Sequence, residues 1–148
     1  MYKEEFSRSE IMKEAGLSQG RLTHYINSGI ITAPRGSGSG IHAKYSLLNL
    51  GEAIIAKALT DDYHFQLPQV RNIIELIDES ELENVGKRTS KKALIIVDRN
   101  FAKIVPEEEA TTETALRMSK IHRTKRTTST DVSGEKCKSI LIFYLSEA

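Results

Sequence analysis

A polar and basic stretch near the N-terminus has the residue types of a nucleic-acid contact surface. On the outward side of a helix it places Ser18, Gln19, Arg21, His24 and Asn27. Short polar and basic side chains of this kind bond to base edges in the major groove and to phosphate oxygens. Leu22 and Ile26 fall on the inward side. We therefore expect the outward residues to contact DNA, with Gln19 and Arg21 reading bases.

A second group of basic and hydroxyl side chains flanks a Pro/Gly/Ser segment, Pro34 to Gly40. Its members are Arg35, His42, Lys44 and Tyr45. Held on a loop, such groups bond mainly to the phosphate backbone, which positions a protein on DNA but carries little sequence information. Two roles stay open for Tyr25, which is either a core aromatic with its hydroxyl at the rim or a direct DNA contact.

The residue pattern argues against other site chemistry. Cys137 is the only cysteine, and neither His24 nor His42 is accompanied by a cysteine or carboxylate cluster at ligand spacing, so we expect no metal site. The glycine-rich segment 36–40 lacks the lysine and following helix of a phosphate-binding loop. No nucleophile with an oriented base is recognisable. We expect a protein that is not an enzyme and uses no cofactor.

Two short helices are expected to position the first group. Ser7-Arg8-Ser9-Glu10 has the spacing of a capping box, and Gly16 can end the helix in a left-handed conformation. Ser18 is placed to cap a second helix, which Gly29 ends. Two helices joined by a glycine-containing turn are typical of a helix-turn-helix.

The next segment predicts a β-wing and two further helices. Ile30 to Thr32 and Ile41 to Tyr45 are expected to be strands on either side of the glycine-rich loop. Ser46 is the expected cap of a third helix that ends near Asp61-Asp62. A fourth helix begins near Pro68, since proline is tolerated at a first helical position.

The second half of the chain predicts a small α/β unit. Strands are expected at Ala93 to Val97 and at Phe101 to Val105. From Pro106 a helix is expected to run to about Ile121, because Glu107, Glu108 and Glu109 suit the positive end of a helix dipole. The near-continuous apolar run Ser139 to Leu145 is typical of a strand buried on both faces.

The polar pattern of residues 78 to 92 indicates a connector between these halves. The sequence thus predicts an α+β fold with three parts. Residues 1–78 form a DNA-binding domain of four helices plus a β-wing, residues 79–92 form the connector, and residues 93–148 form the small α/β domain. We expect that last domain to serve dimerisation, effector sensing or partner binding.

From about Phe6 to Ile77 the chain resembles the winged helix-turn-helix of MerR-family transcriptional regulators. The matching segments are Ala15-Gly16-Leu17-Ser18, Tyr25, Gly29-Ile30-Ile31, Pro34-Arg35, Gly40 to Ser46, and His64 to Val70. In the recognition helix, Thr23, which we also count among the expected DNA contacts, stands where the family usually has an arginine that binds phosphate, and Arg21 is the expected substitute. The long dimerising coiled coil of many members is not visible in residues 78–92.

This resemblance implies a bacterial-type transcription regulator that binds double-stranded DNA as a homodimer, with a small molecule or a protein as effector. Two alternatives remain: an excisionase-like architectural protein that bends DNA, and an adaptor whose winged helix binds a protein. The 148 residues contain 21 Lys plus Arg and 20 Asp plus Glu, so the net charge of +1 gives no general attraction to nucleic acid. Without a signal peptide or a membrane-spanning run, we expect a cytoplasmic location and no membrane partner.

Overall fold

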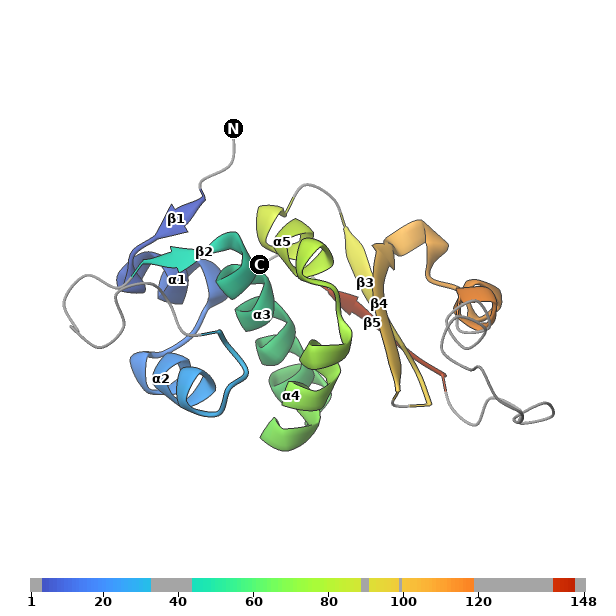
Figure 1. Cartoon of the computed structure of the whole chain (residues 1–148), viewed down its shortest axis with the longest axis horizontal. Coiled ribbons are helices and arrows are strands. Elements are labelled where there is room, and N and C mark those ends of the chain that lie inside the picture. Colours follow the sequence, from blue (N-terminus) through green and yellow to red (C-terminus); the bar gives the residue numbers. More distant parts are fainter. Residues whose placement is uncertain (1–3, 33–43, 89–90, 99, 119–139, 146–148) are drawn as a thin grey trace, which may run out of the picture.

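The chain has a mixed α+β structure in which helices α3 to α5 lie between a helical pair on one side and a small sheet on the other (Figure 1). This is a computed structural model, and it describes residues 4–32, 44–88, 91–98, 100–118 and 140–145. The expected α+β class is confirmed for these residues. The residues proposed to contact DNA from a helix all lie on the helical pair or beside it.

Local capping signals define this pair, α1 (Arg8–Ala15) and α2 (Gln19–Asn27). Ser7 and Glu10 form the reciprocal capping box of α1, and Gly16 ends this helix at φ 69°. The Ser18 side chain accepts a hydrogen bond from the backbone N–H of Arg21 at the start of α2. Both expected helices are therefore confirmed.

After α2 the backbone bends and does not form a strand. The N–H groups of both Ile30 and Ile31 donate to the carbonyl oxygen of Tyr25, so neither is left for a strand partner. The expected strand from Ile30 to Thr32 is therefore wrong, although both isoleucines are buried as their apolar character requires. Residues 33–43, which include the glycine-rich segment and the start of the second expected wing strand, lie outside the described residues.

A two-stranded antiparallel ladder ties the N-terminus to the start of the central helices. Strand β1 (Glu5–Phe6) pairs with β2 (Tyr45–Ser46), so that Phe6 lies opposite Tyr45. Ser46 then caps α3 (Leu47–Lys57), which continues as a short π-helix, η1 (Ala58–Asp62). Helix α4 (Leu67–Leu76) carries a proline in its first turn. The expected third and fourth helices are confirmed.

Helix α5 (Glu79–Lys87) forms within the segment expected to be a connector. It packs closely on α3 because two glycines let the backbones approach. A Cβ on Gly51 would lie 1.9 Å from the carbonyl oxygen of Leu82, and a Cβ on Gly86 would lie 2.4 Å from that of Leu47. The contact between α3 and α5 is therefore a backbone contact that tolerates no side chain at either glycine.

The sheet contains β3 (Lys92–Val97), β4 (Phe101–Pro106) and β5 (Ile140–Leu145) in the order β4-β3-β5, with both pairings antiparallel. The first two expected strands are confirmed. The expectation that the third strand is buried on both faces is wrong, because β5 is an edge strand with Leu141 and Tyr144 exposed. Strand β3 holds the central position and is buried from Ala93 to Val97.

The expected continuous helix from Pro106 is also wrong. Glu107–Glu109 form one turn of 3-10 helix (η2), and Ala110 leaves the helical conformation at φ −82° and ψ 76°. Ala110 is buried against the sheet, and a second helical segment, 112–118, begins after Thr111 caps the N–H of Thr114. Burial of Ala110 therefore interrupts the helix that the glutamates were expected to start.

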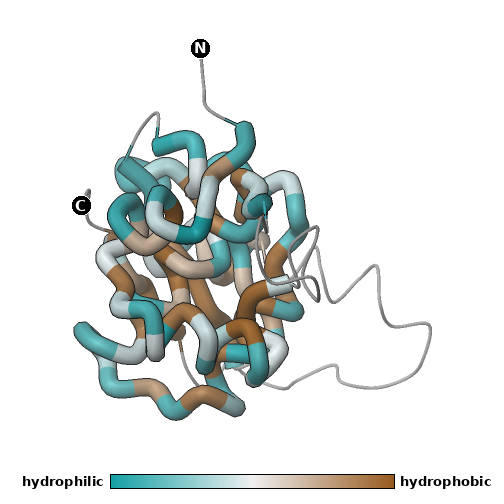
Figure 2. Tube along the Cα trace, turned by 90° about the vertical axis from the view of Figure 1, so that its left-hand side faces the viewer, coloured by the Kyte–Doolittle hydropathy of each residue, from teal (hydrophilic) through white to brown (hydrophobic). Residues whose placement is uncertain are grey.

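The sheet has a hydrophobic core on each face. Leu94, Ile96 and Phe143 join a cluster that also contains residues of all five helices α1 to α5. On the other face, Ile95 and Val97 pack with Ala115 of segment 112–118. Figure 2 shows hydrophobic segments enclosed by hydrophilic ones. One core cluster contains residues of both 1–78 and 93–148, so packing alone does not separate the two parts. The division into domains therefore stays a prediction.

Candidate nucleic-acid interface

One face of α2 is exposed and carries polar, uncharged side chains. Its exposed residues are Ser18, Gln19, Gly20, Thr23, His24 and Asn27, whereas Leu22 and Tyr25 are buried. The exposed positions recur every three to four residues, which is the period of one helix face. Five of the sequence-predicted contacts, Ser18, Gln19, Thr23, His24 and Asn27, are therefore brought together on one accessible stripe.

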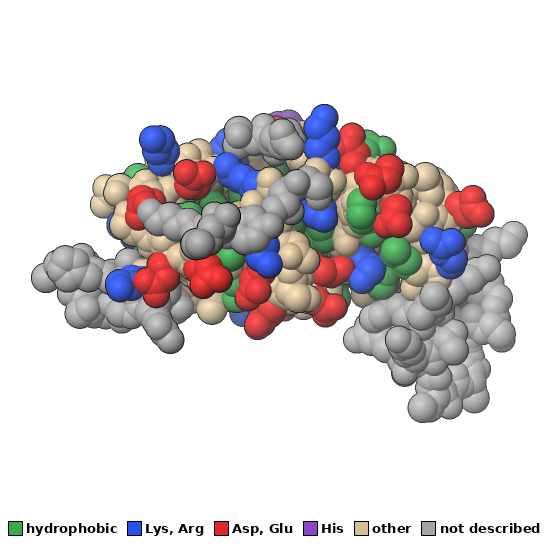
Figure 3. Space-filling view, turned by 90° about the horizontal axis from the view of Figure 1, so that it is seen from above, with side chains coloured by type: hydrophobic (Ala, Val, Ile, Leu, Met, Phe, Trp, Pro, Cys, Tyr) green, Lys and Arg blue, Asp and Glu red, His purple; other side chains and the backbone are tan. Residues whose placement is uncertain are grey.

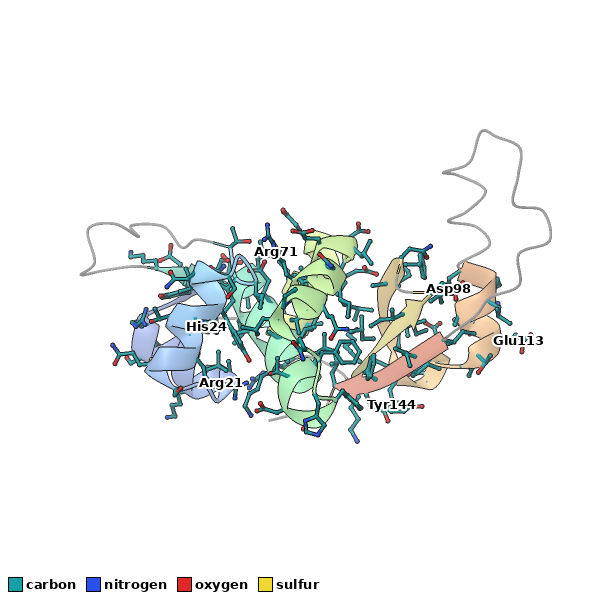
Figure 4. The ribbon with its side chains drawn as sticks, turned by 90° about the horizontal axis from the view of Figure 1, so that it is seen from below. Arg21, His24, Arg71, Asp98, Glu113 and Tyr144 are labelled. Atoms are coloured by element: carbon teal, nitrogen blue, oxygen red, sulfur yellow. The ribbon has the colours of Figure 1, made fainter. Side chains whose placement is uncertain are left out.

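Arg21 lies beside this stripe and is held by internal partners. Its Nη2 lies 2.8 Å from Oδ1 of Asp61, and its Nη1 lies 3.0 Å from Oδ2. Nη2 also donates to the hydroxyls of Tyr25 at 2.6 Å and Thr60 at 2.9 Å. Figure 4 shows Arg21 on α2, extending toward the central helices. Arg21, one of the two residues that we expected to read bases, thus joins α2 to η1.

The pair shifts both pKa values in the direction of the charged forms. Hydrogen bonding to Arg21 lowers the pKa of the Asp61 carboxyl, and hydrogen bonding to Asp61 raises the pKa of the Arg21 guanidinium. Tyr25 is only 2% exposed, with its hydroxyl between Arg21 and Thr60. Of the two roles left open for Tyr25, this geometry is that of a core aromatic whose hydroxyl is bonded at the rim.

Arg8 was missed by the sequence reasoning and joins three elements. Its Nη1 donates to the Tyr45 hydroxyl at 3.2 Å, and its Nη2 donates to the carbonyl oxygen of Gln19 at 3.4 Å and to Oγ1 of Thr23. Tyr45 is buried on β2, so its hydroxyl faces Arg8. The sequence offered no signal for this role, because a basic residue in the first turn of a helix is typical of a solvated surface.

The remaining predicted contacts belong to the segment that was expected to form a wing. Lys44 is exposed, and its Nζ lies 3.5 Å from Oε2 of Glu5. Arg35 and His42 lie outside the described residues. Figure 3, which views the molecule from above, shows acidic and basic side chains interspersed over the described surface. That mixture agrees with the near-zero net charge of the chain.

Thr32, the last described residue before segment 33–43, is anchored by a buried carboxylate. Glu52 of α3 is 5% exposed and accepts hydrogen bonds from the backbone N–H of Thr32 at 3.0 Å, from its hydroxyl at 2.9 Å and from Nδ2 of Asn49 at 3.2 Å. Burial raises the pKa of Glu52, although these hydrogen bonds act in the opposite direction. Asn49 Nδ2 also donates to the carbonyl oxygen of Thr32. Thr32 is therefore fixed to α3 where the segment 33–43 begins.

Metal-ligating groups, membrane-spanning helices and cavities are the other features of the described residues that bear on function. These residues contain no group of three or more His, Cys, Asp or Glu that could hold a metal ion, and Cys137 lies outside them. No described helix is long and apolar enough to cross a membrane. A cavity of about 100 Å³ borders η1, and it is lined by Ala15, Ile54, Lys57, Ala58, Asp61, Asp62, Arg88 and Leu145.

Comparison with known proteins gives no relative, since no protein-family model, curated protein or solved structure matches the chain. The interpretation of the site therefore rests on its own geometry.

Proposed function

We propose that the chain is a sequence-specific DNA-binding transcription regulator, in which α1 and α2 form a helix-turn-helix and α2 is the recognition helix. The observation that carries this proposal is the exposed polar stripe of α2. A helix that only covers a core needs no particular chemistry on its outer face. This stripe instead offers the amide groups of Gln19 and Asn27, which suit bidentate bonds to adenine in a major groove.

The length of the stripe also suits a groove. From Gln19 to Asn27 the helix rises about 12 Å at about 1.5 Å per residue. With base pairs about 3.4 Å apart, this length corresponds to roughly three or four base pairs. A single helix of this size reads one half-site, so the proposal includes a homodimer on a pseudo-palindromic operator.

The phosphate contacts in this proposal come from the region around the stripe. Lys44 is exposed at the end of the wing segment, and Arg35 and His42 are assigned to it on sequence grounds alone. The anchoring of Thr32 by Glu52 and the pairing of Tyr45 with Phe6 fix the two ends of that segment. Lys44 is therefore placed next to the β1–β2 ladder, and the contribution of Arg35 and His42 stays a prediction from the sequence.

The test is DNA binding by the full chain across a salt series, using a pool of genomic fragments. The Gln19→Ala, Asn27→Ala double variant removes both amides from the stripe. Asn72→Ala with Asn84→Ala is the matched control, since these asparagines are exposed on α4 and α5. We expect the wild type and control to select the same fragments and the stripe variant to lose selectivity, with each lost base contact costing about 1–3 kcal/mol. Equal binding by both double variants would refute the recognition role of α2.

One observation favours a second candidate function, an adaptor whose helical pair binds a protein. Arg21 is bonded to Asp61 and is therefore not free for a phosphate in this conformation. The affinity for DNA falls steeply with salt concentration because phosphates are neutralised on binding, whereas the affinity for a protein partner need not. Failure of the wild type to bind any fragment at low salt would favour the adaptor. Binding with strong DNA bending and no effect on transcription would favour the architectural alternative.

A further inference from the structure

The two outer edges of the sheet differ in how they are protected from other strands. Strand β4 carries Pro106, and a proline is a common device that discourages edge-to-edge pairing. It also carries Lys103, whose Nζ lies 2.9 Å from Oε1 of Glu81 on α5. Strand β5, Ile140–Leu145, contains neither a charged residue nor a proline in its six positions. Its second edge has no paired strand among the described residues. Unlike β4, this edge therefore carries no device against strand pairing.

Exposed hydrophobic side chains gather at the same edge. The large hydrophobic side chains recorded as exposed in the described part of the chain are Tyr63 (37%), Leu141 (38%) and Tyr144 (52%). Leu141 and Tyr144 belong to β5, and the ring of Tyr63 lies 4.3 Å from that of Phe143 on the same strand. In the view from below, Tyr144 points outward from β5 (Figure 4). Within the described part of the chain, an edge without a paired strand and exposed apolar side chains thus coincide at β5.

We propose that β5 is a homodimer interface, at which the strand pairs antiparallel with β5 of a second copy. An edge strand presents alternating N–H and C=O groups, which only another strand satisfies in register. Antiparallel pairing of a strand with its own copy has two-fold symmetry, so one patch serves both partners. Because β5 is uncharged, the two copies bring no like charges together. The two sheets then form one six-stranded sheet.

The geometry of pairing restricts the register. Residues directly opposite in an antiparallel pair place their side chains on the same face. Even-numbered residues of β5 must therefore lie opposite even-numbered ones, and odd opposite odd. Two registers place both exposed residues opposite residues of β5 in the second copy. In one, Tyr144 lies opposite Ile140 and Leu141 opposite Phe143; in the other, Tyr144 lies opposite Ile142 and Leu141 opposite Leu145. In either register both exposed side chains lie against uncharged ones.

The first test is the oligomeric state of the full chain, measured without DNA by sedimentation velocity over a wide concentration series. We expect a dimer for the wild type and a monomer for the Leu141→Lys, Tyr144→Lys double variant. The Asn72→Lys, Asn84→Lys double variant adds the same charge at exposed positions on α4 and α5, and it is expected to remain a dimer. A monomeric wild type, or a dimer that survives both lysines in β5, would overturn the proposal.

A second measurement uses only the wild type and so does not depend on how the variants fold. Amide hydrogen exchange of residues 140–145 is expected to slow as the protein concentration rises, while exchange of β4 stays constant. Concentration-independent exchange at β5 would contradict the interface. The β5 interface deepens the proposed function, from which the homodimer is taken, but neither measurement involves DNA, so failure of this interface and failure of DNA binding are distinguishable.

Discussion

The guanidinium of Arg21 and the carboxylate of Asp61 form a paired contact, with N–O distances of 2.8 and 3.0 Å, that joins the first turn of α2 to η1, the π-helical continuation of α3. Both side chains are more than a third exposed, so the pair contributes only about 0.2–1 kcal/mol to stability. Its larger consequence is for the proposed DNA binding, because the carboxylate holds a cation beside the proposed recognition stripe.

Replacing Asp61 by Asn is expected to tighten DNA binding. The change frees Arg21 for a phosphate and removes a negative charge, so the slope of log affinity against log salt should steepen by about one. Asp62→Asn is the matched control, since it removes the same charge from the neighbouring residue, for which no bond to Arg21 is present. Binding isotherms at several salt concentrations measure the affinity and its salt slope for both variants. Weaker binding by Asp61→Asn alone would show that the pair positions α2 and does not restrain Arg21.

Glu52→Gln is expected to make folding less sensitive to pH. The folded-state pKa of Glu52 is raised above its ordinary value of 4.5, so the folded state binds the proton more tightly than the unfolded state does. This carboxyl therefore lowers the free energy of unfolding as the pH rises from about 4.5 through the raised pKa. Glutamine does not ionise. Its Oε1 can accept from Thr32 and Asn49, while its Nε2 donates to the Thr32 hydroxyl.

Urea unfolding of wild type and Glu52→Gln from pH 4.5 to neutral provides the measurement. The variant should gain stability relative to the wild type with increasing pH. Glu83→Gln, at an exposed position of α5, is the control and should follow the wild type. Parallel profiles for Glu52→Gln and the wild type would mean that Glu52 has no raised pKa.

Gly51→Ala is expected to destabilise the fold, whereas Gly20→Ala should stabilise it. A Cβ at position 51 would meet the carbonyl oxygen of Leu82 at 1.9 Å, so α3 and α5 must move apart, at a cost of about 1–3 kcal/mol or more. A Cβ at position 20 meets nothing within 4 Å. There, alanine gains about 0.5–1 kcal/mol from its better helix propensity. The midpoint temperatures of thermal unfolding of both variants provide the measurement. Similar changes in the two midpoints would contradict the close packing of α3 and α5.

Two substitutions of Ser18 separate its role as the cap of α2 from its proposed role as part of the DNA-contacting stripe. Ser18→Ala removes the acceptor for the Arg21 N–H and should cost about 0.5–2 kcal/mol of stability. Ser18→Asp keeps an acceptor at the cap and favours the positive end of the helix, so stability is retained. Aspartate also places a negative charge at the stripe, and DNA binding should fall sharply. Unchanged binding by Ser18→Asp would place the DNA elsewhere.

The sequence by itself determined the elements whose signals are local. Ser7 and Glu10 lie three residues apart, Gly16 and Ser18 flank one turn, and Pro68 starts a helix, so capping and backbone preference suffice to place these ends. The helical period also separated the exposed Gln19 and Asn27 from the buried Leu22. These features depend on residues within one or two turns of each other.

Only the tertiary structure decided which distant groups meet. Arg21 and Asp61 are 40 residues apart, and nothing near either residue indicates the other as its partner. Helix α5 was missed because it packs on α3 through Gly51 and Gly86, so it needs few apolar side chains and its sequence is polar. The apolar run of β5 is compatible with a central or an edge strand. Its position depends on the order β4-β3-β5, which is set by long-range pairing that no local pattern encodes.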